Sequence, residues 1–250
     1  MSDLDDVTGR NRLSGRRIVV TGAASGLGDA IARLFVRQGA RLVLFDINAK
    51  VSETADALGQ TGVVTDVSSE ASVNAAIEQA ATALGGLDGV VNAAGVLHRS
   101  TVEDTDFTLF QKIIGVNLAG PFLMCRAALP HLRKAPRATI VNIASLAGLQ
   151  GFPRMGVYSA SKAGLIRMSE ALSGEVGPTI RINCICPGVI RTPMTEYMFE
   201  DDYDFQAEKS IQVGRPGEPL DIAQAALYLS SEESAFVAGT TLTVSGGRLS

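Results

Sequence analysis

The chain has few of the side chains on which metal sites and hydrolytic triads depend. Its 250 residues include two histidines, His98 and His131, three cysteines and no tryptophan. Two histidines give neither a credible metal cluster nor a Ser-His-Asp arrangement. We therefore predict a site that holds no metal ion.

The cysteines do not predict a disulfide framework. They are odd in number, and Cys184 and Cys186 alternate on one face of the apolar segment 180–186. Buried, reduced thiols of a cytosolic protein explain them best. Residues 1–6 are acidic and lack the basic and then apolar regions of a secretory signal, and no uncharged apolar run approaches membrane-spanning length. We expect a cytoplasmic protein with no membrane partner.

Net charge is also small. With 22 Lys and Arg against 26 Asp and Glu, the charge of −4 gives no electrostatic reason to expect nucleic acid as a partner. Hydrophobic residues make up 46% of the chain, enough for a large core. Residues 1–12 predict a flexible N-terminal arm. No linker or break in composition follows, so residues 13–250 predict a single domain.

Apolar segments alternate with helical patterns along that domain. The strands are apolar on both faces, which is typical of a parallel sheet covered by helices on both sides. Helices are expected after 28 and over 50–58, 69–84, 104–134, a segment carrying Tyr158, and 220–230. Strands are expected over 17–21, 41–46, 63–66, 87–92, 138–144, 180–186 and 240–244. The prediction is an α/β fold with a seven-stranded parallel sheet.

Three glycines lie directly between the first strand and the first helix. Gly22 permits a tight turn, Gly26 allows backbone to approach a pyrophosphate, and Gly28 lets the helix lie close to the sheet. The helix N-terminus then offers free N–H groups to the phosphates. A glycine-rich turn without ligand is the alternative, but the position between strand and helix favours a dinucleotide.

Asp46 ends the second strand, where a carboxylate contacts the ribose hydroxyls of a dinucleotide. A phosphate on that ribose would be repelled, and neither Ser25 nor Ile47 offers a compensating positive charge. The residue therefore favours NAD over NADP. An N-cap for the next helix is the alternative role.

Tyr158 and Lys162 are four residues apart, so a helix places both on one face. A nearby ammonium favours the phenolate and should lower the pKa of Tyr158, which makes a general base possible. Ser145 follows the predicted strand 138–144, at the sheet edge where ligands of α/β proteins bind. A surface Tyr and Lys with a turn serine is the alternative interpretation.

Asn117 lies four residues before Pro121 in a helical pattern. A proline cannot donate a hydrogen bond to that carbonyl and opens the turn. The free carbonyl can hold a water that passes protons between Lys162 and solvent. The alternative is an asparagine that only tolerates a kink.

Several segments, taken together and in order, resemble the short-chain dehydrogenase/reductase family. Residues 21–28 (TGAASGLG) resemble the family's cofactor loop, and residues 92–95 (NAAG) resemble its Asn-Asn-Ala-Gly segment. Residues 66–67 resemble the family's adenine contact, and residues 187–192 resemble its segment on the nicotinamide side. The likeness spans nearly all of 13–247. Ala93 and Ser245 depart from the family pattern, which has asparagine and aspartate there.

The resemblance implies a doubly wound Rossmann-type domain that transfers hydride between a carbinol carbon and NAD. It implies the catalytic residues Asn117, Ser145, Tyr158 and Lys162. It implies cofactor contacts at Gly22, Ser25, Gly26, Leu27, Gly28, Asp46, Asp66, Val67, Asn92, Ala93, Gly95, Tyr158, Lys162, Pro187, Gly188, Val189, Ile190 and Thr192. In these roles Tyr158 moves the alcohol proton, Ser145 holds the substrate oxygen, and Lys162 also bonds the nicotinamide ribose.

The resemblance also implies a homotetramer. The stretch 107–132 is too apolar for one buried face, and the small residues after Tyr158 allow close helix approach (Ala160, Ser161, Ala163 and Gly164). A purely internal core is the alternative. His98 and Arg99 are able to reach the mouth of the site, but a solvated loop is favoured.

The segment 188–216 crosses the site as a lid in this family. Apolar side chains of the lid and of 145–158 predict an adaptable apolar wall (Met194, Met198, Phe199, Phe205, Leu149, Phe152 and Met155). Acidic residues give the rim a negative potential (Glu196, Glu200, Asp201, Asp202 and Asp204). We expect an uncharged, largely apolar secondary alcohol or ketone, plausibly cyclic or aryl. Alternatives are a 3-oxoacyl-carrier-protein reductase, a steroid dehydrogenase, a related lyase, or an NAD-sensing binding protein without activity.

Overall fold

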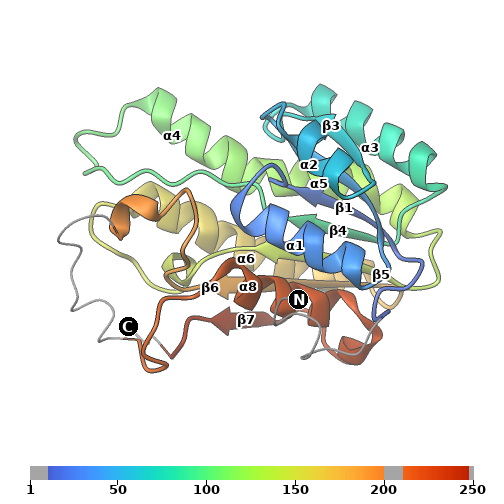
Figure 1. Ribbon diagram of the computed structural model, residues 1–250. Coiled ribbons are helices and arrows are strands. Elements are labelled where there is room, and N and C mark those ends of the chain that lie inside the picture. The colour runs from blue at the N-terminus through green and yellow to red at the C-terminus, as the bar shows by residue number, and fades with distance from the viewer. Residues whose placement is uncertain (1–10, 200–210, 248–250) are drawn as a thin grey trace.

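A parallel β-sheet forms the centre of the structure, a computed structural model that describes residues 11–199 and 211–247. Within these residues the sheet has seven strands in the order β3-β2-β1-β4-β5-β6-β7, and every neighbouring pair is parallel. The strands are β1 Arg17–Thr21, β2 Arg41–Asp46, β3 Thr61–Val64, β4 Gly89–Asn92, β5 Ala138–Ile143, β6 Ile180–Pro187 and β7 Thr241–Val244. The predicted α/β fold with a seven-stranded parallel sheet is confirmed (Figure 1).

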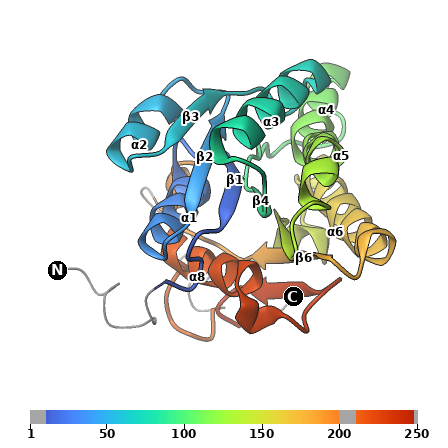
Figure 2. The ribbon, with the colours of Figure 1, turned by 90° about the vertical axis from the view of Figure 1, so that its right-hand side faces the viewer.

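Helices cover both faces of this sheet, as Figure 2 shows end-on. Helices α1 and α8 lie together on one face, and α3, α5 and α6 lie on the other. Neighbouring strand residues point to opposite layers: Val20 packs with the α1 and α8 side, and Val19 with the α3 and α5 side. The helices are α1 Gly26–Arg37, α2 Val51–Ala57, α3 Glu70–Leu84, α4 Phe107–Ile114, α5 Gly120–Leu132, α6 Gly156–Val176 and α8 Pro219–Ser230.

Strand β3 lies two residues earlier than predicted. Its partner β2 ends at Asp46, which pairs with Val64. Beyond Val64, β3 therefore has no strand residue to pair with. Thr65 still donates its N–H to the Asp46 carbonyl at 2.8 Å. The chain has left the strand at Asp66, whose carboxylate accepts a hydrogen bond from the N–H of Ser68.

The helical stretch predicted over 104–134 begins later and changes its winding in the middle. Asp106 caps α4 by accepting from the N–H of Leu109 at 2.7 Å. Between α4 and α5 lies one π-helical turn, Gly115–Ala119, directly before Pro121. The widened turn lies where the missing proline N–H predicted a disturbance of the helix.

Among the described residues, Phe107–Leu132 is a helix long and apolar enough to cross a membrane by length and composition alone. Its second half packs against α3 and the sheet, with Met124, Cys125 and Ala128 buried in the core. It is a core helix of a soluble protein.

Parts of the sequence prediction lie outside the described residues. These are residues 1–10 of the arm and the lid residues Glu200, Asp201, Asp202, Asp204 and Phe205.

Candidate active site

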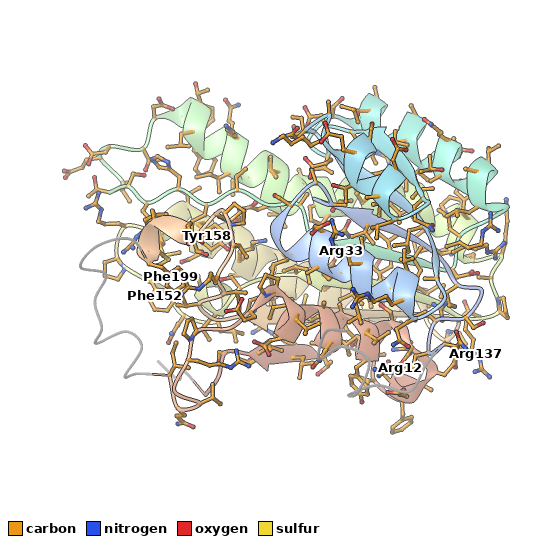
Figure 3. All side chains as sticks on the ribbon, in the orientation of Figure 1. Arg12, Arg33, Arg137, Phe152, Tyr158 and Phe199 are labelled. Atoms are coloured by element: carbon orange, nitrogen blue, oxygen red, sulfur yellow. The ribbon has the colours of Figure 1, made fainter. Side chains whose placement is uncertain are left out.

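A cavity of about 360 Å³ opens at the carboxyl ends of the strands. Tyr158 and Phe152 line it, and Figure 3 shows them with Phe199 at one end of the molecule, far from Arg12 and Arg137. Parallel sheets bind ligands at this edge, where the strand order reverses between β1 and β4. Eleven of the predicted residues line the cavity: Leu27, Ala93, Gly95, Ser145, Tyr158, Lys162, Pro187, Gly188, Val189, Ile190 and Thr192.

Helix α6 carries both Tyr158 and Lys162, as the four-residue spacing predicts. The Lys162 ammonium lies 5.9 Å from the centroid of the Tyr158 ring. It donates a hydrogen bond of 2.8 Å to the carbonyl of Ile143, the last residue of β5. Lys162 is only 4% exposed, so its charge is held in an environment of low dielectric.

Ser145 leaves β5 at the N-terminus of a short 3₁₀ turn, Leu146–Gly148. Its hydroxyl accepts from the N–H of Ala147 at 3.1 Å, which fixes the side chain in the cavity. The Ser145 side chain lies close enough to Tyr158 to favour its phenolate form. A hydroxyl donor and a phenol thus meet at one point of the cavity, where a substrate oxygen could bind both.

The pKa of Tyr158 differs from the prediction. Burial raises the pKa above the usual value for a phenol, and the nearby Ser145 hydroxyl only partly opposes this effect. Burial also lowers the pKa of Lys162 to about 8. Loss of hydration therefore decides the direction of the Tyr158 shift, and Lys162 is not among the groups that lower this pKa.

Asn117 lies in the π-helical turn and is completely buried. Its side chain donates to the carbonyl of Val96 at 2.9 Å and accepts from the Val96 N–H at 2.9 Å. Its amide also donates to the Ser161 hydroxyl at 3.2 Å. The side chain is thus fully used in joining the loop after β4 to α6.

The glycine loop fits a dinucleotide. A Cβ at Gly22 would lie 2.8 Å from Ala94 Cα, and a Cβ at Gly28 only 2.1 Å from the Gly22 carbonyl oxygen. A Cβ at Gly26 would be in ordinary contact with Thr192, at 3.7 Å, but its φ of 58° lies in the left-handed region that favours glycine. Ser25 occupies the N-cap of α1 without a side-chain cap bond, which leaves the helix N–H groups for an anion.

Asp46 holds the loop that would surround the adenosine. One carboxylate oxygen accepts from the N–H of Ala24 at 3.0 Å, and the other from the N–H of Asn48 at 2.8 Å. It does not cap α2, whose N-cap is Lys50. Ile47 beside it is 70% exposed.

Asn92 lies away from the cavity. Its amide donates to the Asn142 side chain at 2.7 Å, and Asn142 donates to the hydroxyl of Ser169 on α6 at 2.8 Å. Val67 is also buried, with its side chain near Gly120. These residues are placed to support the site rather than to touch a ligand by their side chains.

Sequence analysis missed two features of the site, and it left Arg99 between two positions. Thr21 accepts from the N–H groups of Ala93 and Ala94 and so ties β4 to the glycine loop. Asn142 was also missed, although it could have been noticed as one of two polar residues in an otherwise apolar strand. Arg99 lines the cavity, although a solvated loop was favoured for it.

Comparison with known proteins agrees with this geometry. The sequence model of the family described as "Enoyl-(Acyl carrier protein) reductase" matches residues 22–248. The chain belongs to the short-chain dehydrogenase/reductase family. Such enzymes use NAD or NADP and act on alcohols and ketones, so the predicted class of enzyme is confirmed.

Three similar short-chain dehydrogenases/reductases illustrate the range of substrates. The chain is 37% identical over 242 residues to the 3-alpha-(or 20-beta)-hydroxysteroid dehydrogenase of Mycobacterium bovis, covering 94% of this chain and 90% of that protein. It is 38% identical over 246 residues to the 2,5-dichloro-2,5-cyclohexadiene-1,4-diol dehydrogenase of Sphingobium indicum, covering 95% and 97%. A glucose/ribitol dehydrogenase structure of this family from Brucella melitensis superposes with a TM-score of 0.92 at 33% identity, covering 97% and 100%.

Proposed function

We propose that the protein is an NAD-dependent dehydrogenase of secondary alcohols, or reductase of ketones, in which Tyr158 is the acid and base. The observation that carries this proposal is the meeting of Ser145, Tyr158 and Lys162 in one cavity. The effect of Ser145 on the pKa of the phenol and the ammonium 5.9 Å from the phenol ring support their joint action.

The bound nicotinamide supplies or accepts the hydride. Ser145 donates to the substrate oxygen and stabilises the negative charge that grows there in the transition state. Tyr158 gives its phenolic proton to that oxygen in reduction and removes it in oxidation. Lys162 opposes the negative charge on Tyr158 when the proton leaves and binds the nicotinamide ribose. The Asn117 carbonyl holds a water that returns the proton from solvent through Lys162.

NAD rather than NADP is the proposed cofactor. The Asp46 carboxylate ends β2 beside the glycine loop, and a ribose phosphate there would be repelled. Ile47 follows it and brings no positive charge. The nucleotide is held by the assigned cofactor residues, chiefly Gly22, Gly26 and Gly28 and the segment that follows Pro187.

The reacting end of the substrate is largely apolar and plausibly cyclic or aryl. Phe152, Met155, Met194 and Met198 line the cavity and form an adaptable apolar wall. Two of the relatives reported above are named for ring alcohols, a steroid and a cyclohexadiene diol. Leu149 is 46% exposed and takes no part in this wall.

The expectation of an uncharged substrate rested on the acidic lid. Glu196 does not line the cavity, and it lies 3.9 Å from Arg191, which opposes its charge. The other acidic residues lie outside the described part of the chain. We therefore restrict the proposal about the substrate to its reacting end, which is largely apolar.

We also propose a cytoplasmic homotetramer. Phe107, Phe110 and Phe122 are exposed on α4 and α5, which supports a contact with a second copy. Sedimentation velocity tests this: a monomer at working concentration would contradict it.

Initial rates at alkaline pH, with NAD or NADP and a panel of aliphatic, cyclic, aryl and steroid alcohols, test the function. We expect cyclic or aryl secondary alcohols and NAD to give the highest kcat/KM. Efficient reduction of a carrier-bound 3-oxoacyl chain, with little activity on neutral ring ketones, would contradict the substrate class. Tight NAD binding without turnover of any alcohol would indicate the cofactor-sensing alternative.

A further inference from the structure

The cavity holds one charged residue that the proposed chemistry does not use. Of its lining residues in the described part of the chain, only Lys162 and Arg99 carry a charge, and none is a carboxylate. Lys162 is buried and belongs to the reacting centre. Arg99 is exposed on the loop that follows β4, and it lines the cavity from the side of that loop.

A second arginine lies on the neighbouring loop. The N–H of Ser100 donates to the carbonyl of Arg154 at 2.9 Å, which joins the two loops beside the cavity. Arg154 has φ 63°, a left-handed conformation that costs energy for a residue with a Cβ. It directly precedes Met155, which lines the cavity.

These two cations are not neutralised by the part of the chain that the structure describes. Within residues 11–199 and 211–247, no carboxylate forms an ion pair with Arg99 or Arg154. The nearby Asp104 accepts from the Thr101 hydroxyl at 2.6 Å, and Asp106 caps α4.

Arg191, also close to the cavity, shows the contrast. It lies 3.9 Å from Glu196 and 4.0 Å from Glu218, and its guanidinium stacks on the ring of Phe199 at 4.3 Å. Its charge is already opposed. Among the arginines at or beside the cavity, Arg99 and Arg154 are therefore the two that no described carboxylate pairs with.

We propose that the substrate carries an anionic group, a carboxylate or sulfonate, at the end remote from its alcohol or ketone, and that Arg99 binds it. This inference rests on the proposed function and narrows its substrate. A guanidinium binds such oxyanions with two parallel hydrogen bonds, and the apolar wall beside it strengthens the attraction. Arg154 adds to the positive potential at the mouth. A cavity of about 360 Å³ has room for a ring and one such group.

A matched pair of ketones tests the proposal. The holoenzyme with NADH is given 4-acetylbenzoate or its neutral methyl ester, and kcat/KM is measured for the wild type, Arg99→Gln and Arg37→Gln. Arg37 is an exposed arginine at the end of α1, so its replacement is a control for the change in net charge. We expect Arg99→Gln to lower kcat/KM for the acid at least about tenfold and leave that for the ester within about twofold, with no effect of Arg37→Gln.

Binding of benzoate and benzamide to the protein–NADH complex, measured by calorimetry, separates the two proposals. Arg99-dependent preference for benzoate without reduction of either ketone would support the anion site and contradict the proposed function. Equal binding of benzoate and benzamide, or a preference that Arg99→Gln leaves unchanged, would overturn the anion site. Reduction of the ester in that case would leave the proposed function standing.

Discussion

Replacing Lys162 with methionine removes a buried charge while keeping most of the side-chain volume. Burial lowers the pKa of Lys162 from 10.5 to about 8. One pKa unit corresponds to about 1.4 kcal/mol, so the buried ammonium costs about 3 kcal/mol of folding free energy. Methionine also gives up the hydrogen bond from the ammonium to the Ile143 carbonyl, worth about 2 kcal/mol because the donor is charged. We expect Lys162→Met to raise the free energy of unfolding by about 1 kcal/mol at pH 7 and to abolish turnover.

The pH dependence provides a second check. Because the pKa of Lys162 is lower in the folded state, the unfolded state binds more protons between pH 8 and 10.5. The stability of the wild type should therefore rise through this window relative to that of the variant. The advantage of Lys162→Met is complete below about pH 8 and disappears above about pH 10.5.

Urea unfolding at fixed protein concentration, from pH 7 to 10, measures both effects. Lys134→Met, at an exposed lysine after α5, is the matched control and should change stability by less than about 0.5 kcal/mol. A Lys162→Met variant that is less stable than the wild type at pH 7 would refute the reasoning. So would a stability difference that does not change with pH.

Two further variants test the cofactor site. Asp46→Ser combined with Ile47→Arg should move the ratio of kcat/KM for NADP over NAD upward at least about tenfold, since a repelling carboxylate is exchanged for a cation; wild-type protein that uses both cofactors equally would contradict the role of Asp46. Gly28→Ala should weaken NAD binding at least about tenfold, because its Cβ would lie 2.1 Å from the Gly22 oxygen and force the loop to move. Gly174→Ala, on α6 with no atom within 4 Å of the new Cβ, is its control and should leave NAD affinity unchanged.

Features that depend on short stretches of chain were predictable from the sequence. The strand–glycine–helix order of residues 17–37 and the spacing of Tyr158 and Lys162 are local patterns. The apolar strands likewise predicted the parallel sheet, although β3 lies two residues earlier than expected because its end is set by β2.

Features that arise from packing between distant segments were not predictable. The chain from Asn92 through Asn142 to Ser169 joins residues 77 positions apart, and only the fold brings them together. The direction of the shift in the Tyr158 pKa likewise depends on burial of the phenol. Burial cannot be predicted from the spacing of Tyr158 and Lys162. The place of Arg99 at the cavity depends on the course of a loop.

The central claim is that Tyr158 transfers the substrate proton, and Tyr158→Phe tests it most directly. The ring stays and only the hydroxyl is lost, so the affinity for NADH should be unchanged. Formation of NADH from NAD and the best secondary alcohol of the panel, followed by absorbance, should fall at least about a hundredfold in kcat. Turnover of about one tenth of the wild-type rate or more would contradict the role of Tyr158.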